Sequence, residues 1–503
     1  MELGELVRAS GVSAEIRGDS AVEIGDLAYD SRRVGTGTLY FCFKGERADG
    51  HEFAARAIEA GAAALVVERP LEVDAPQVQV EDARAAMAPI AASFHGDPTA
   101  ELAIVGITGT NGKTTTAFLI RALLEAAGSR CGLLGTVRQV VGGKAEEVER
   151  STPEAIDLQR TFARMLEAGD VACAMEVSSH ALVLHRAAAI HFAVKVFTNL
   201  SQDHLDFHAD MEDYFAAKRL LFSGEGGAPI IEIEGGISVL NVDDPYGQRL
   251  AGELSCGSGG ECITYSAAGG DADLSAREVA FDASGSRFLC LSPEGELQVE
   301  TPLPGDFNVS NALAALAVAY ALGLDLQRSA EVLGTAEQVP GRFESIDEGQ
   351  PFGVIVDYAH TPDSLENVLA AARRITEGRV ISVFGCGGDR DRDKRPQMGR
   401  AGAELSDLAV VTSDNPRSEE PAAIIEEIRA GIPETPHAEV VVEPDRRAAI
   451  ALALGRAGEG DTVVVAGKGH EQGQEFENGR KIPFDDRDVA REELRRLAAG
   501  AAS

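Results

Sequence analysis

Short runs of apolar residues, separated by amphipathic stretches and glycine-rich turns, run the length of this chain. Near the N-terminus, such runs predict strands over residues 27–30, 38–43 and 64–68, and amphipathic stretches predict helices over 52–61 and 83–94. The sequence His-Gly-Asp-Pro then interrupts the pattern at residues 95–98. The pattern predicts a small α/β domain over residues 1–97.

A second region, residues 98–336, begins with a buried strand, a glycine-rich turn and a helix over residues 102–128. Further strands are predicted over 172–177 and 193–200. Alternation of apolar and polar residues from about 262 to 300 predicts a β-rich section, and residues 308–323 predict a helix. We expect a central P-loop ATPase-like domain with a parallel sheet.

Regular βαβ alternation fills the third region, residues 337–503. The predicted strands cover residues 353–358, 379–385, 408–413, 438–443 and 461–467, with helices between them. This is typical of an open, mostly parallel sheet, so the third domain is expected to be Rossmann-like. The predicted fold class is therefore α/β with three domains.

Composition narrows the possible partners. The 503 residues include 44% hydrophobic ones and carry a net charge of −35, which argues against nucleic acid or an anionic membrane as a partner. The N-terminal sequence lacks a signal-peptide core, and no apolar run approaches the ~20 residues of a membrane span. Seven scattered cysteines without a CxxC pair favour reduced thiols and a cytoplasmic protein.

The strongest chemical signal is the turn after the strand at residue 102, which reads Gly109-Thr110-Asn111-Gly112-Lys113-Thr114. Glycines let the backbone curl so that N–H groups face an anion, and the following helix adds its positive end. Lys113 would reach the β- and γ-phosphates, and the Thr114 hydroxyl would hold Mg²⁺. Ile107 stands where the common pattern has its first glycine, so Gly109 is expected to make the turn.

Acidic and basic residues follow two later strands. Glu176 ends a buried strand, where a carboxylate can hold Mg²⁺. His204 and His208 lie among acids just before a helix that carries Lys218. By themselves, such histidines are surface or internally satisfied residues more often than ligands, and a helix lysine is usually solvated.

Three loops at strand ends in the third region are candidates for a ligand pocket, because open α/β sheets bind ligands there. They are residues 387–399, 414–417 and 467–471. Arg390 and Arg417 suit carboxylate recognition, and Glu471 suits an ammonium group. Together they predict a pocket for an amino acid. Arg395 is a further candidate anion clamp, whereas Arg392 and Lys394 are interpreted as a solvated charge run.

These motifs resemble those of the Mur ligases, ATP-dependent enzymes that extend the peptidoglycan stem peptide, over essentially the whole chain. The resemblance rests on GITGTNGKTTT, MEVSSHAL, FTNLSQDHLDFH, GDFNVSN, VPGRFE, DYAHTP, GGDRD, DNPR and GKGHE. Folylpolyglutamate ligases share several of them, but the last three together are more specific. Within the family, the chain is similar to members that add the third residue to UDP-N-acetylmuramoyl-L-Ala-D-Glu.

The resemblance implies roles for individual residues. Lys113, Glu176, His204 and Lys218 would be catalytic, with two Mg²⁺ ions held by Thr114, Glu176, His204 and Lys218, the last as a carbamate. ATP would contact Gly109, Thr110, Asn111, Gly112, Lys113, Thr114, Thr115, Asn308, Arg342 and Asp357. The UDP-N-acetylmuramoyl-dipeptide would contact Ser31, Asp49, Gly50, Ser151, Thr152, Ser178 and Arg186. Diaminopimelate would contact Arg390, Asp414, Asn415, Pro416, Arg417, Gly467 and Glu471. Leu184 departs from the family, where some relatives have Gln.

The implied reaction adds meso-diaminopimelate to the γ-carboxylate of D-Glu through an acyl phosphate, in cytoplasmic peptidoglycan precursor synthesis by a monomer. The DNPR sequence resembles the diaminopimelate-adding form. Arg417 would pair with the second carboxylate of diaminopimelate but would repel the ammonium of lysine, at about 2–5 kcal/mol. The alternatives are L-lysine as substrate, a phosphate-loop NTPase that acts as a switch, and another amide ligase of the superfamily.

Overall fold

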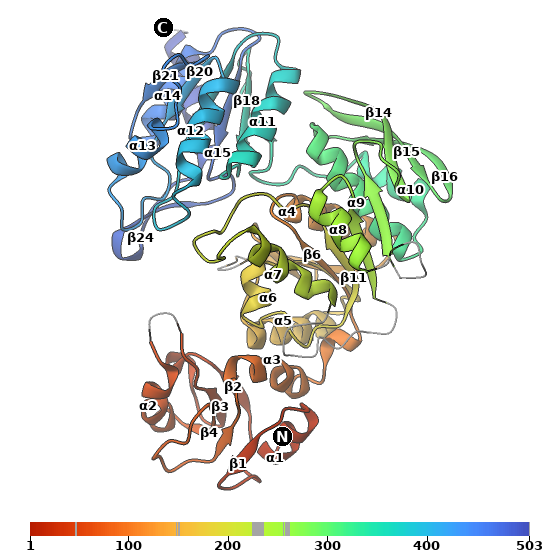
Figure 1. The fold of residues 1–503 in the computed structure, drawn as a ribbon, viewed down its shortest axis with the longest axis vertical. Helices are drawn as coiled ribbons and strands as arrows, with labels where there is room; N and C mark the ends of the chain where they lie inside the picture. The colour runs from red at the N-terminus through yellow and green to blue at the C-terminus, as the bar shows by residue number, and fades with distance from the viewer. Residues whose placement is uncertain are drawn as a thin grey trace. The chain divides into compact units, whose positions relative to one another are not determined.

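The computed structural model describes residues 1–45, 48–146, 148, 151–223, 236–254, 256 and 262–501 (Figure 1). The chain divides into two compact units. The first unit contains residues 1–108, 127–196 and 216–238, and the second contains residues 109–126, 197–215 and 239–503. The boundaries 1–97, 98–336 and 337–503 drawn from the sequence remain a prediction.

The N-terminal part of the first unit is a five-stranded sheet with helices packed on it. The strand order is β1 (Glu15–Arg17), β5 (Gln77–Gln79), β4 (Ala62–Val67), β3 (Thr38–Phe41) and β2 (Asp26–Ala28). Only the β1–β5 pair is antiparallel. The helices are α1 (Leu3–Ala9), α2 (Ala54–Glu59) and α3 (Ala83–Phe94). Apolar residues of α1, α3 and the sheet form one core, so the elements predicted in this region are confirmed.

The remaining strands of the first unit follow the order β11 (Phe192–Phe197), β6 (Ala103–Thr108), β10 (Ala172–Glu176), β7 (Cys131–Leu134), β8 (Gln139–Val141) and β9 (Lys144–Glu146). Strand β10 runs parallel to both β6 and β7 and is wholly buried, which explains its unbroken apolar sequence. Helices α5 (Ala155–Ala168) and α6 (Ser179–Val183) flank β10 in sequence. The register pairs Glu176 with Ile107, so Glu176 lies at the carboxyl ends of β10 and β6.

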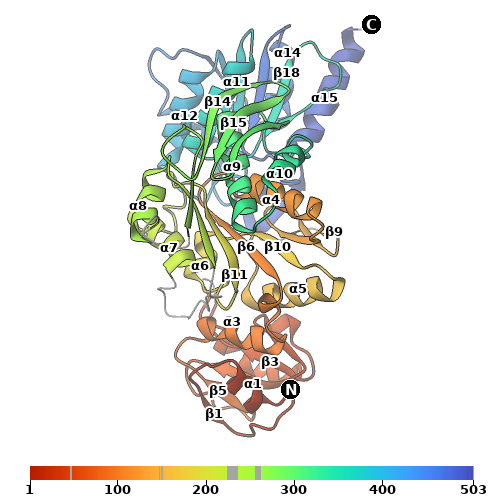
Figure 2. The same cartoon turned by 90° about the vertical axis from the view of Figure 1, so that its right-hand side faces the viewer.

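In the second unit, helices α4 (Lys113–Ala126), α9 (Asp306–Ala321) and α10 (Leu326–Leu333) pack together. The strand order is β16 (Gly295–Thr301), β15 (Gly285–Ser292), β14 (Leu274–Asp282), β13 (Cys262–Ser266) and β12 (Ile237–Asn241), shown in green in Figure 2. Strands β14, β15 and β16 form an antiparallel meander. The predicted β-rich section and the helix after it are confirmed. Helices α7 (Met211–Ser223) and α8 (Pro245–Glu253) precede them in the chain.

One cysteine expectation is wrong. Cys256 and Cys262 form a disulfide, since their Cα atoms lie 5.5 Å apart, within the range that a disulfide spans. A spacing of six residues gave no sequence signal for this bond. The other five cysteines are free thiols and are buried: Cys42, Cys131, Cys173, Cys290 and Cys386.

The C-terminal part of the second unit is the predicted open sheet. Its order is β17 (Glu344–Ser345), β18 (Gly353–Asp357), β22 (Thr462–Ala466), β19 (Val380–Phe384), β20 (Leu408–Val411) and β21 (Glu439–Val442). All pairs are parallel except that of the edge strand β17. One face packs on α11 (Pro362–Ile375), α12 (Lys394–Leu405) and α13 (Pro421–Arg429), and the other on α14 (Arg446–Arg456) and α15 (Asp486–Ala501).

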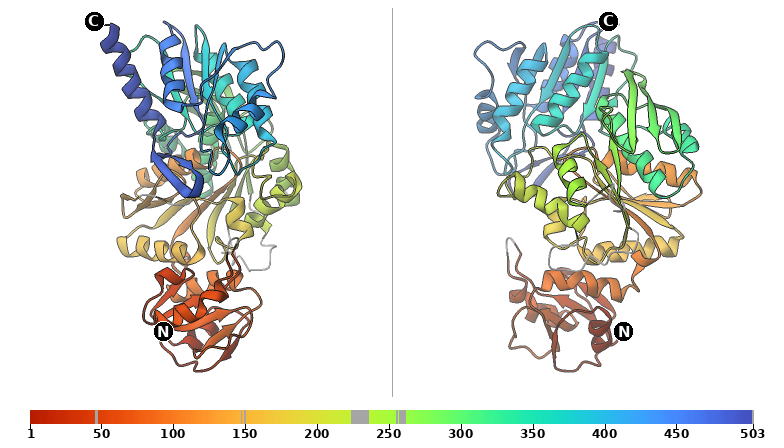
Figure 3. Two further views of the ribbon diagram at one scale, coloured as in Figure 1. Left: turned by 90° about the vertical axis from the view of Figure 1, so that its left-hand side faces the viewer. Right: turned by 45° about the vertical axis from the view of Figure 1, so that its right-hand side comes forward.

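A hairpin that the sequence did not predict follows β22. It pairs β23 (Gly473–Phe476) with β24 (Arg480–Pro483) and is visible in dark blue in the left view of Figure 3. The α/β fold class, with mixed and parallel sheets, is confirmed. In the described part of the chain, no helix is both long and apolar enough to cross a membrane.

Candidate active site

The phosphate-loop sequence is held by the segment that follows β11. The backbone N–H of Thr110 donates to the Asn199 carbonyl at 2.9 Å, and that of Asn111 donates to Asn199 Oδ1 at 2.8 Å. Thr198 Oγ1 donates to the Asn111 carbonyl at 2.6 Å. These two N–H groups therefore serve to shape the loop. Anion binding by backbone groups would fall to Gly112 and the first turn of α4, where Thr114 and Thr115 are buried.

Two glycines of this loop have no room for a side chain. Gly109 has φ 149° and Gly112 has φ 86°. A Cβ on Gly109 would lie 1.9 Å from Thr198 Oγ1, and one on Gly112 would lie 2.4 Å from Asn311 Oδ1. Lys113 Nζ curls over the loop and donates to the carbonyls of Gly109 and Thr110 at 2.9 and 2.7 Å. Gly109, with its positive φ, therefore makes the turn that the usual pattern assigns to a glycine at position 107.

Arg342 brings a second positive charge to the start of α4. Its Nη2 donates to Thr114 Oγ1 at 3.1 Å, and its guanidinium lies 4.3 Å from the centre of the Tyr358 ring. Burial raises the pKa of Asp357 to about 6, although Arg342 and two backbone N–H groups, those of Phe343 and Ala359, oppose the rise. Two of the predicted nucleotide residues, Arg342 and Asp357, therefore lie beside the phosphate loop.

Asn308 uses its side chain within the protein. Its Nδ2 donates to the Pro304 carbonyl at 2.9 Å, and its Oδ1 accepts from Asn311 Nδ2 at 3.1 Å. Asn311 Oδ1 in turn accepts from Thr116 Oγ1 on α4 at 3.3 Å. Asn308 thus supports the loop through Asn311, and its contact with adenine remains a prediction.

A charged cluster surrounds Asp203, which sequence reasoning did not single out. Its Oδ2 lies 3.2 Å from His204 Nε2 and 3.8 Å from His360 Nε2, and its Oδ1 lies 4.0 Å from Lys394 Nζ. Burial raises the pKa of Asp203, but His204, His360 and Lys394 together hold it well below its usual range. Burial, and then the charge of Lys394, lower the pKa of His360.

The interpretation of Lys394 as a solvated residue is wrong, because its side chain is buried at the start of α12. Arg392 does face solvent, paired with Glu427. Arg395 is fully buried and forms ion pairs with Glu419 and Glu427. Its charge therefore stabilises the fold, and Arg395 does not serve to bind an anionic ligand. A run of charges in the sequence does not reveal which of its members turn inward.

In the first unit, Glu176 and Lys218 are both buried. The two carboxylate oxygens of Glu176 accept from the Thr136 N–H at 2.7 Å and the Thr136 hydroxyl at 2.9 Å. These two contacts fix the orientation of the Glu176 carboxylate. No group of three or more His, Cys, Asp or Glu side chains with the geometry of a metal site occurs among the described residues.

Asp49 lies in an ordered network near the start of the chain. Its Oδ2 accepts from Arg69 Nη2 at 2.8 Å, and its Oδ1 accepts from His51 Nδ1 at 2.6 Å. His51 Nε2 accepts from the Glu68 N–H, so the proton of the neutral ring is on Nδ1. Hydrogen bonds from Arg69 and His51 hold the pKa of Asp49 well below its usual range. Gly50 follows it, and Ser31 opens a short 3₁₀ helix.

The residues predicted to meet the dipeptide gather around β10 and α6. Thr152 Oγ1 donates to the Glu176 carbonyl at 3.0 Å and accepts from the Ser178 N–H at 3.3 Å. Ser178 caps α6, and Arg186 Nη2 lies 3.0 Å from Glu154 Oε1. Ser151 precedes Thr152 in the same segment. Glu154 is a residue that sequence reasoning missed, and it orients Arg186.

The predicted amino-acid loops meet at the carboxyl ends of β20 and β22. Asn415 Nδ2 donates to Glu471 Oε2 at 2.7 Å, and Lys468 Nζ donates to Asn415 Oδ1 and Glu471 Oε2, both at 2.8 Å. Lys468 is fully buried and was missed. Glu471 therefore pairs with the ammonium of Lys468, and its contact with the ammonium of an amino acid remains a prediction.

Beneath these loops lies a buried pair, Arg446 and Asp486, joined at 2.7 and 2.8 Å. Arg446 also donates to the carbonyls of Ser413 and Ala466, at the ends of β20 and β22. Burial raises the pKa of Asp414, yet Lys468 and Arg446 lower it below its ordinary value. Gly467 packs against Asp414, since a Cβ there would lie 2.5 Å from Asp414 Oδ2.

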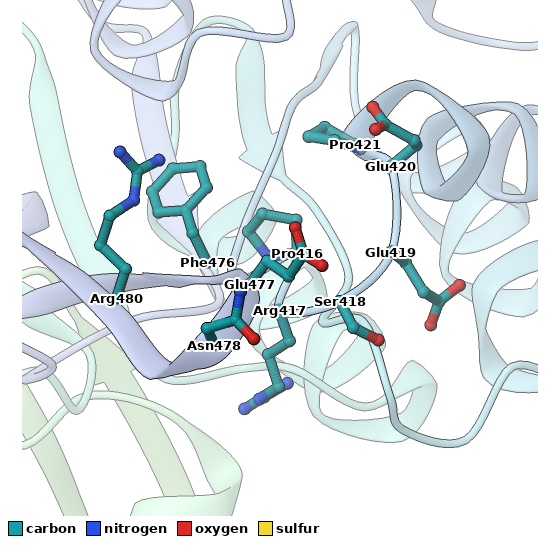
Figure 4. A pocket seen from close by; sticks show the side chains of 10 residues that line it. All are labelled: Pro416, Arg417, Ser418, Glu419, Glu420, Pro421, Phe476, Glu477, Asn478 and Arg480. Carbon is teal, nitrogen blue, oxygen red and sulfur yellow. The ribbon is translucent and has the colours of Figure 1, made fainter.

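Arg417 and Arg390 differ in how firmly they are held. Arg417 Nη1 donates to the Gly388 carbonyl at 2.7 Å, and its Nε donates to Glu475 Oε2 at 3.1 Å. Arg390 is half exposed and lies 3.9 Å from Asp206. A cavity of about 500 Å³ adjoins Pro416 and Arg417. Figure 4 shows its wall, with the rings of Pro416 and Phe476 labelled and the Arg417 side chain pointing away from Pro421. The remaining lining residues are Ser418, Glu419, Glu420, Glu477, Asn478 and Arg480.

The fold and these loops define a class: an α/β protein that combines a glycine-rich loop before a helix with an open sheet that carries charged loops at its strand ends. Models of three Mur ligase domains match the chain. The Mur ligase family catalytic domain matches residues 23–95, the Mur ligase middle domain matches 107–319, and the Mur ligase glutamate ligase domain matches 341–469. The chain belongs to the Mur ligase family.

Several relatives of this chain are named UDP-N-acetylmuramoyl-L-alanyl-D-glutamate–2,6-diaminopimelate ligase. The chain is 47% identical to that of Solibacter usitatus over 98% of both chains. It is 48% identical to that of Streptomyces coelicolor, over 98% of this chain and 96% of the relative. A solved structure of a ligase of this name matches with a TM-score of 0.69 and 30% identity over 99% of both chains.

Proposed function

We propose that this chain is the ATP-dependent ligase that adds meso-diaminopimelate to the D-Glu γ-carboxylate of UDP-N-acetylmuramoyl-L-Ala-D-Glu, in peptidoglycan precursor synthesis in the cytoplasm. The likeness to the Solibacter usitatus ligase over nearly the whole chain carries this proposal. The arrangement of Arg417, Asn415 and Glu471 supports it, because it offers a guanidinium and a carboxylate to a molecule with both charges.

The proposed reaction has two steps. An oxygen of the D-Glu γ-carboxylate attacks the γ-phosphorus of ATP, which gives an acyl phosphate and ADP. The amine of diaminopimelate then attacks the acyl carbon, phosphate leaves with the bonding electrons, and the amine loses a proton to give the amide. Phosphoryl transfer depends mainly on alignment and on neutralised charge. Lys113, Arg342 and the N-terminus of α4 supply positive charge from within the second unit.

Mg²⁺ would neutralise phosphate charge in this reaction. The donor set fits in part. The Glu176 carboxylate and the Thr114 hydroxyl are hard oxygen ligands, and the Asp203 carboxylate, 3.2 Å from His204 Nε2, orients the His204 ring. Carbamylation of Lys218 would convert a buried cation into an oxygen ligand. The proposed ligands of two Mg²⁺ ions are therefore Thr114, Glu176, His204 and carbamylated Lys218.

The test is phosphate release from ATP with UDP-N-acetylmuramoyl-L-Ala-D-Glu and one acceptor, with mass analysis of the product. We expect a tripeptide product with meso-diaminopimelate and little with L-lysine. Equal use of lysine would retain the ligase but contradict the role given to Arg417. Steady ATP hydrolysis with no product from either acceptor would favour an NTPase or another amide ligase.

A further inference from the structure

The hairpin β23–β24 lies along the loop of residues 414–417 almost residue by residue. Gln474 Nε2 donates to the Asp414 carbonyl at 2.6 Å, and the Glu475 N–H donates to Asn415 Oδ1 at 2.9 Å. The Arg417 N–H donates to the Glu475 carbonyl at 3.1 Å, and Arg417 forms an isolated parallel bridge with Phe476. The hairpin therefore acts as a template for this loop.

Arg417 needs such a template because its backbone is in the left-handed region, with φ 50°. That conformation is uncommon for a residue with a side chain, and it persists where the surroundings enforce it. Two backbone-level contacts with Glu475 and Phe476 do so here. The direction in which the guanidinium leaves the loop thus depends on the hairpin.

Glu475 also fixes the guanidinium itself. Its Oε2 accepts from Arg417 Nε at 3.1 Å, while the Gly388 carbonyl accepts from Nη1 at 2.7 Å. Among the described residues, Nη2 of Arg417 has no hydrogen-bond acceptor. A guanidinium is a rigid planar fork, so holding Nε and one side of Nη1 determines where Nη2 points.

We infer that Glu475 is a positioning residue that sets acceptor specificity: it orients the Arg417 guanidinium so that its remaining donors meet the second carboxylate of the amino-acid substrate. The inference rests on the proposed function. Glu475 contacts the Arg417 guanidinium, so its removal should weaken recognition of the distal carboxylate and leave ATP use intact.

The experiment measures KM and kcat of the full-length enzyme for meso-diaminopimelate and for ATP, in the wild type and in Glu475→Ala, Glu475→Gln, Arg417→Ala and the Glu475→Ala/Arg417→Ala double variant. A hydrogen bond between charged groups supports an effect of about 10- to 100-fold. We expect Glu475→Ala to raise KM for diaminopimelate by about tenfold or more, with KM for ATP changed less than about twofold. Glu475→Gln keeps an acceptor oxygen and should recover part of the loss.

The double variant separates orientation from a general role in folding. If Glu475 acts through Arg417, removing it from an enzyme that already lacks Arg417 should add little, so the two effects on KM should be strongly non-additive. Lys481→Ala is the matched control, since Lys481 is exposed and lies opposite Glu475 in the register of the hairpin. It should leave both KM values unchanged.

Additive effects of Glu475→Ala and Arg417→Ala, or an equal rise in KM for diaminopimelate and ATP, would overturn the inference. Relative use of L-lysine gives a second readout, because lysine lacks the distal carboxylate. Glu475→Ala should lower the preference for diaminopimelate over lysine. A wild-type enzyme that makes no product with diaminopimelate would refute the proposed function instead, whatever the variants do.

Discussion

At the scale of single residues, the candidate site is built from buried charges that hold one another in place. Lys468 and Glu471 form an ion pair, and Asn415 bonds to both. Arg446 and Asp486 form a second, fully buried pair below them. Losing one member of a buried pair leaves the other charge uncompensated. Such pairs restrict the side chains around them to one arrangement, which is what recognition of a small charged molecule requires.

Lys218 gives the first prediction at this scale. If Lys218 acts as a carbamate, Lys218→Ala should lose nearly all ligase activity, because an oxygen ligand for Mg²⁺ disappears. Short carboxylic acids such as acetate should restore part of the activity by supplying that oxygen. The measurement is the rate of phosphate release with and without added acetate. Full activity of Lys218→Ala without acetate would contradict the carbamate proposal.

Asp357 gives a prediction for pH. Burial raises its pKa to about 6 in the folded protein, above the ordinary 3.8. The folded state therefore binds the proton more tightly, so the stabilisation from this group is complete below pH 4 and is lost as the pH rises through 6. The full change is about 3 kcal/mol at 1.36 kcal/mol per pKa unit.

The test compares thermal midpoints of the wild type and Asp357→Asn at pH 4.5 and pH 7.5. Asn keeps an acceptor for the Phe343 N–H but does not titrate. Relative to the variant, the wild type should have a higher thermal midpoint at pH 4.5 and a lower one at pH 7.5. A difference between the two proteins that is constant with pH would show that Asp357 keeps its ordinary pKa.

At the scale of elements, each loop of the candidate site depends on a neighbouring segment that is remote in sequence. Asn199 and Thr198, after β11, shape the phosphate loop, and the Asp363 carboxylate of α11 accepts from Asn111 Nδ2 at 2.7 Å and from Ser201 Oγ at 3.1 Å. The 414–417 loop rests in the same way on β23. The loops are therefore positioned by tertiary contacts, and their own sequences specify only that a turn is possible.

Gly112 offers a test of how tightly the phosphate loop is packed. Gly112 and Gly128 both have φ 86°, but a Cβ on Gly112 would lie 2.4 Å from Asn311 Oδ1, whereas one on Gly128 has no neighbour within 4 Å. Both alanine variants bear the same backbone strain, of order 1 kcal/mol. Only Gly112→Ala adds a steric clash at the loop.

We expect Gly112→Ala to raise KM for ATP at least tenfold and to lower the thermal midpoint more than Gly128→Ala does. Steady-state kinetics with ATP varied, together with thermal unfolding of both variants, provide the measurement. If the two variants behave alike, backbone strain accounts for the whole effect and the contact with Asn311 does not matter.

The same element scale shows what could be predicted from the sequence. The strands of the C-terminal sheet were predictable because parallel strands buried on both faces have nearly continuous apolar sequences, as in β19 and β22. Since such strands end at one edge, the three loops that follow them were placed correctly. The hairpin β23–β24 could not be predicted, because its strands are short, polar and partly exposed.

Other residues were missed for a different reason. Lys394, Lys468 and Arg446 are buried, although charged residues are usually exposed and a sequence gives no sign of the partner that makes burial possible. The partners Asp203 and Asp486 lie far away in the chain. The strand-end loops pointed to Arg417 and Glu471, and motif resemblance pointed to Arg342. Neither pointed to Glu475 or Glu154, which hold two of the predicted arginines in place.

At the scale of the whole molecule, the dominant feature is charge. The chain has 81 acidic and 46 basic residues. Many arginines are paired with acids at the surface, such as Arg249 with Glu212 and Arg447 with Glu492. Exposed pairs contribute only about 0–1 kcal/mol each. The excess of carboxylates remains uncompensated, so the folded protein carries net repulsion that the more expanded unfolded chain partly escapes.

Added salt should therefore stabilise this protein. The Debye length falls from about 30 Å at 0.01 M to about 10 Å at 0.1 M, which screens repulsion between distant carboxylates more than attraction within pairs in contact. We expect the thermal midpoint to rise between 0.01 M and 0.1 M NaCl at pH 7.5, by about 2–4 °C per kcal/mol of repulsion removed. Choline chloride should act like NaCl, because screening depends on ionic strength rather than on the cation. A midpoint that falls with salt would mean that the surface ion pairs outweigh the excess negative charge, while a rise with NaCl alone would point to bound Na⁺ as the cause.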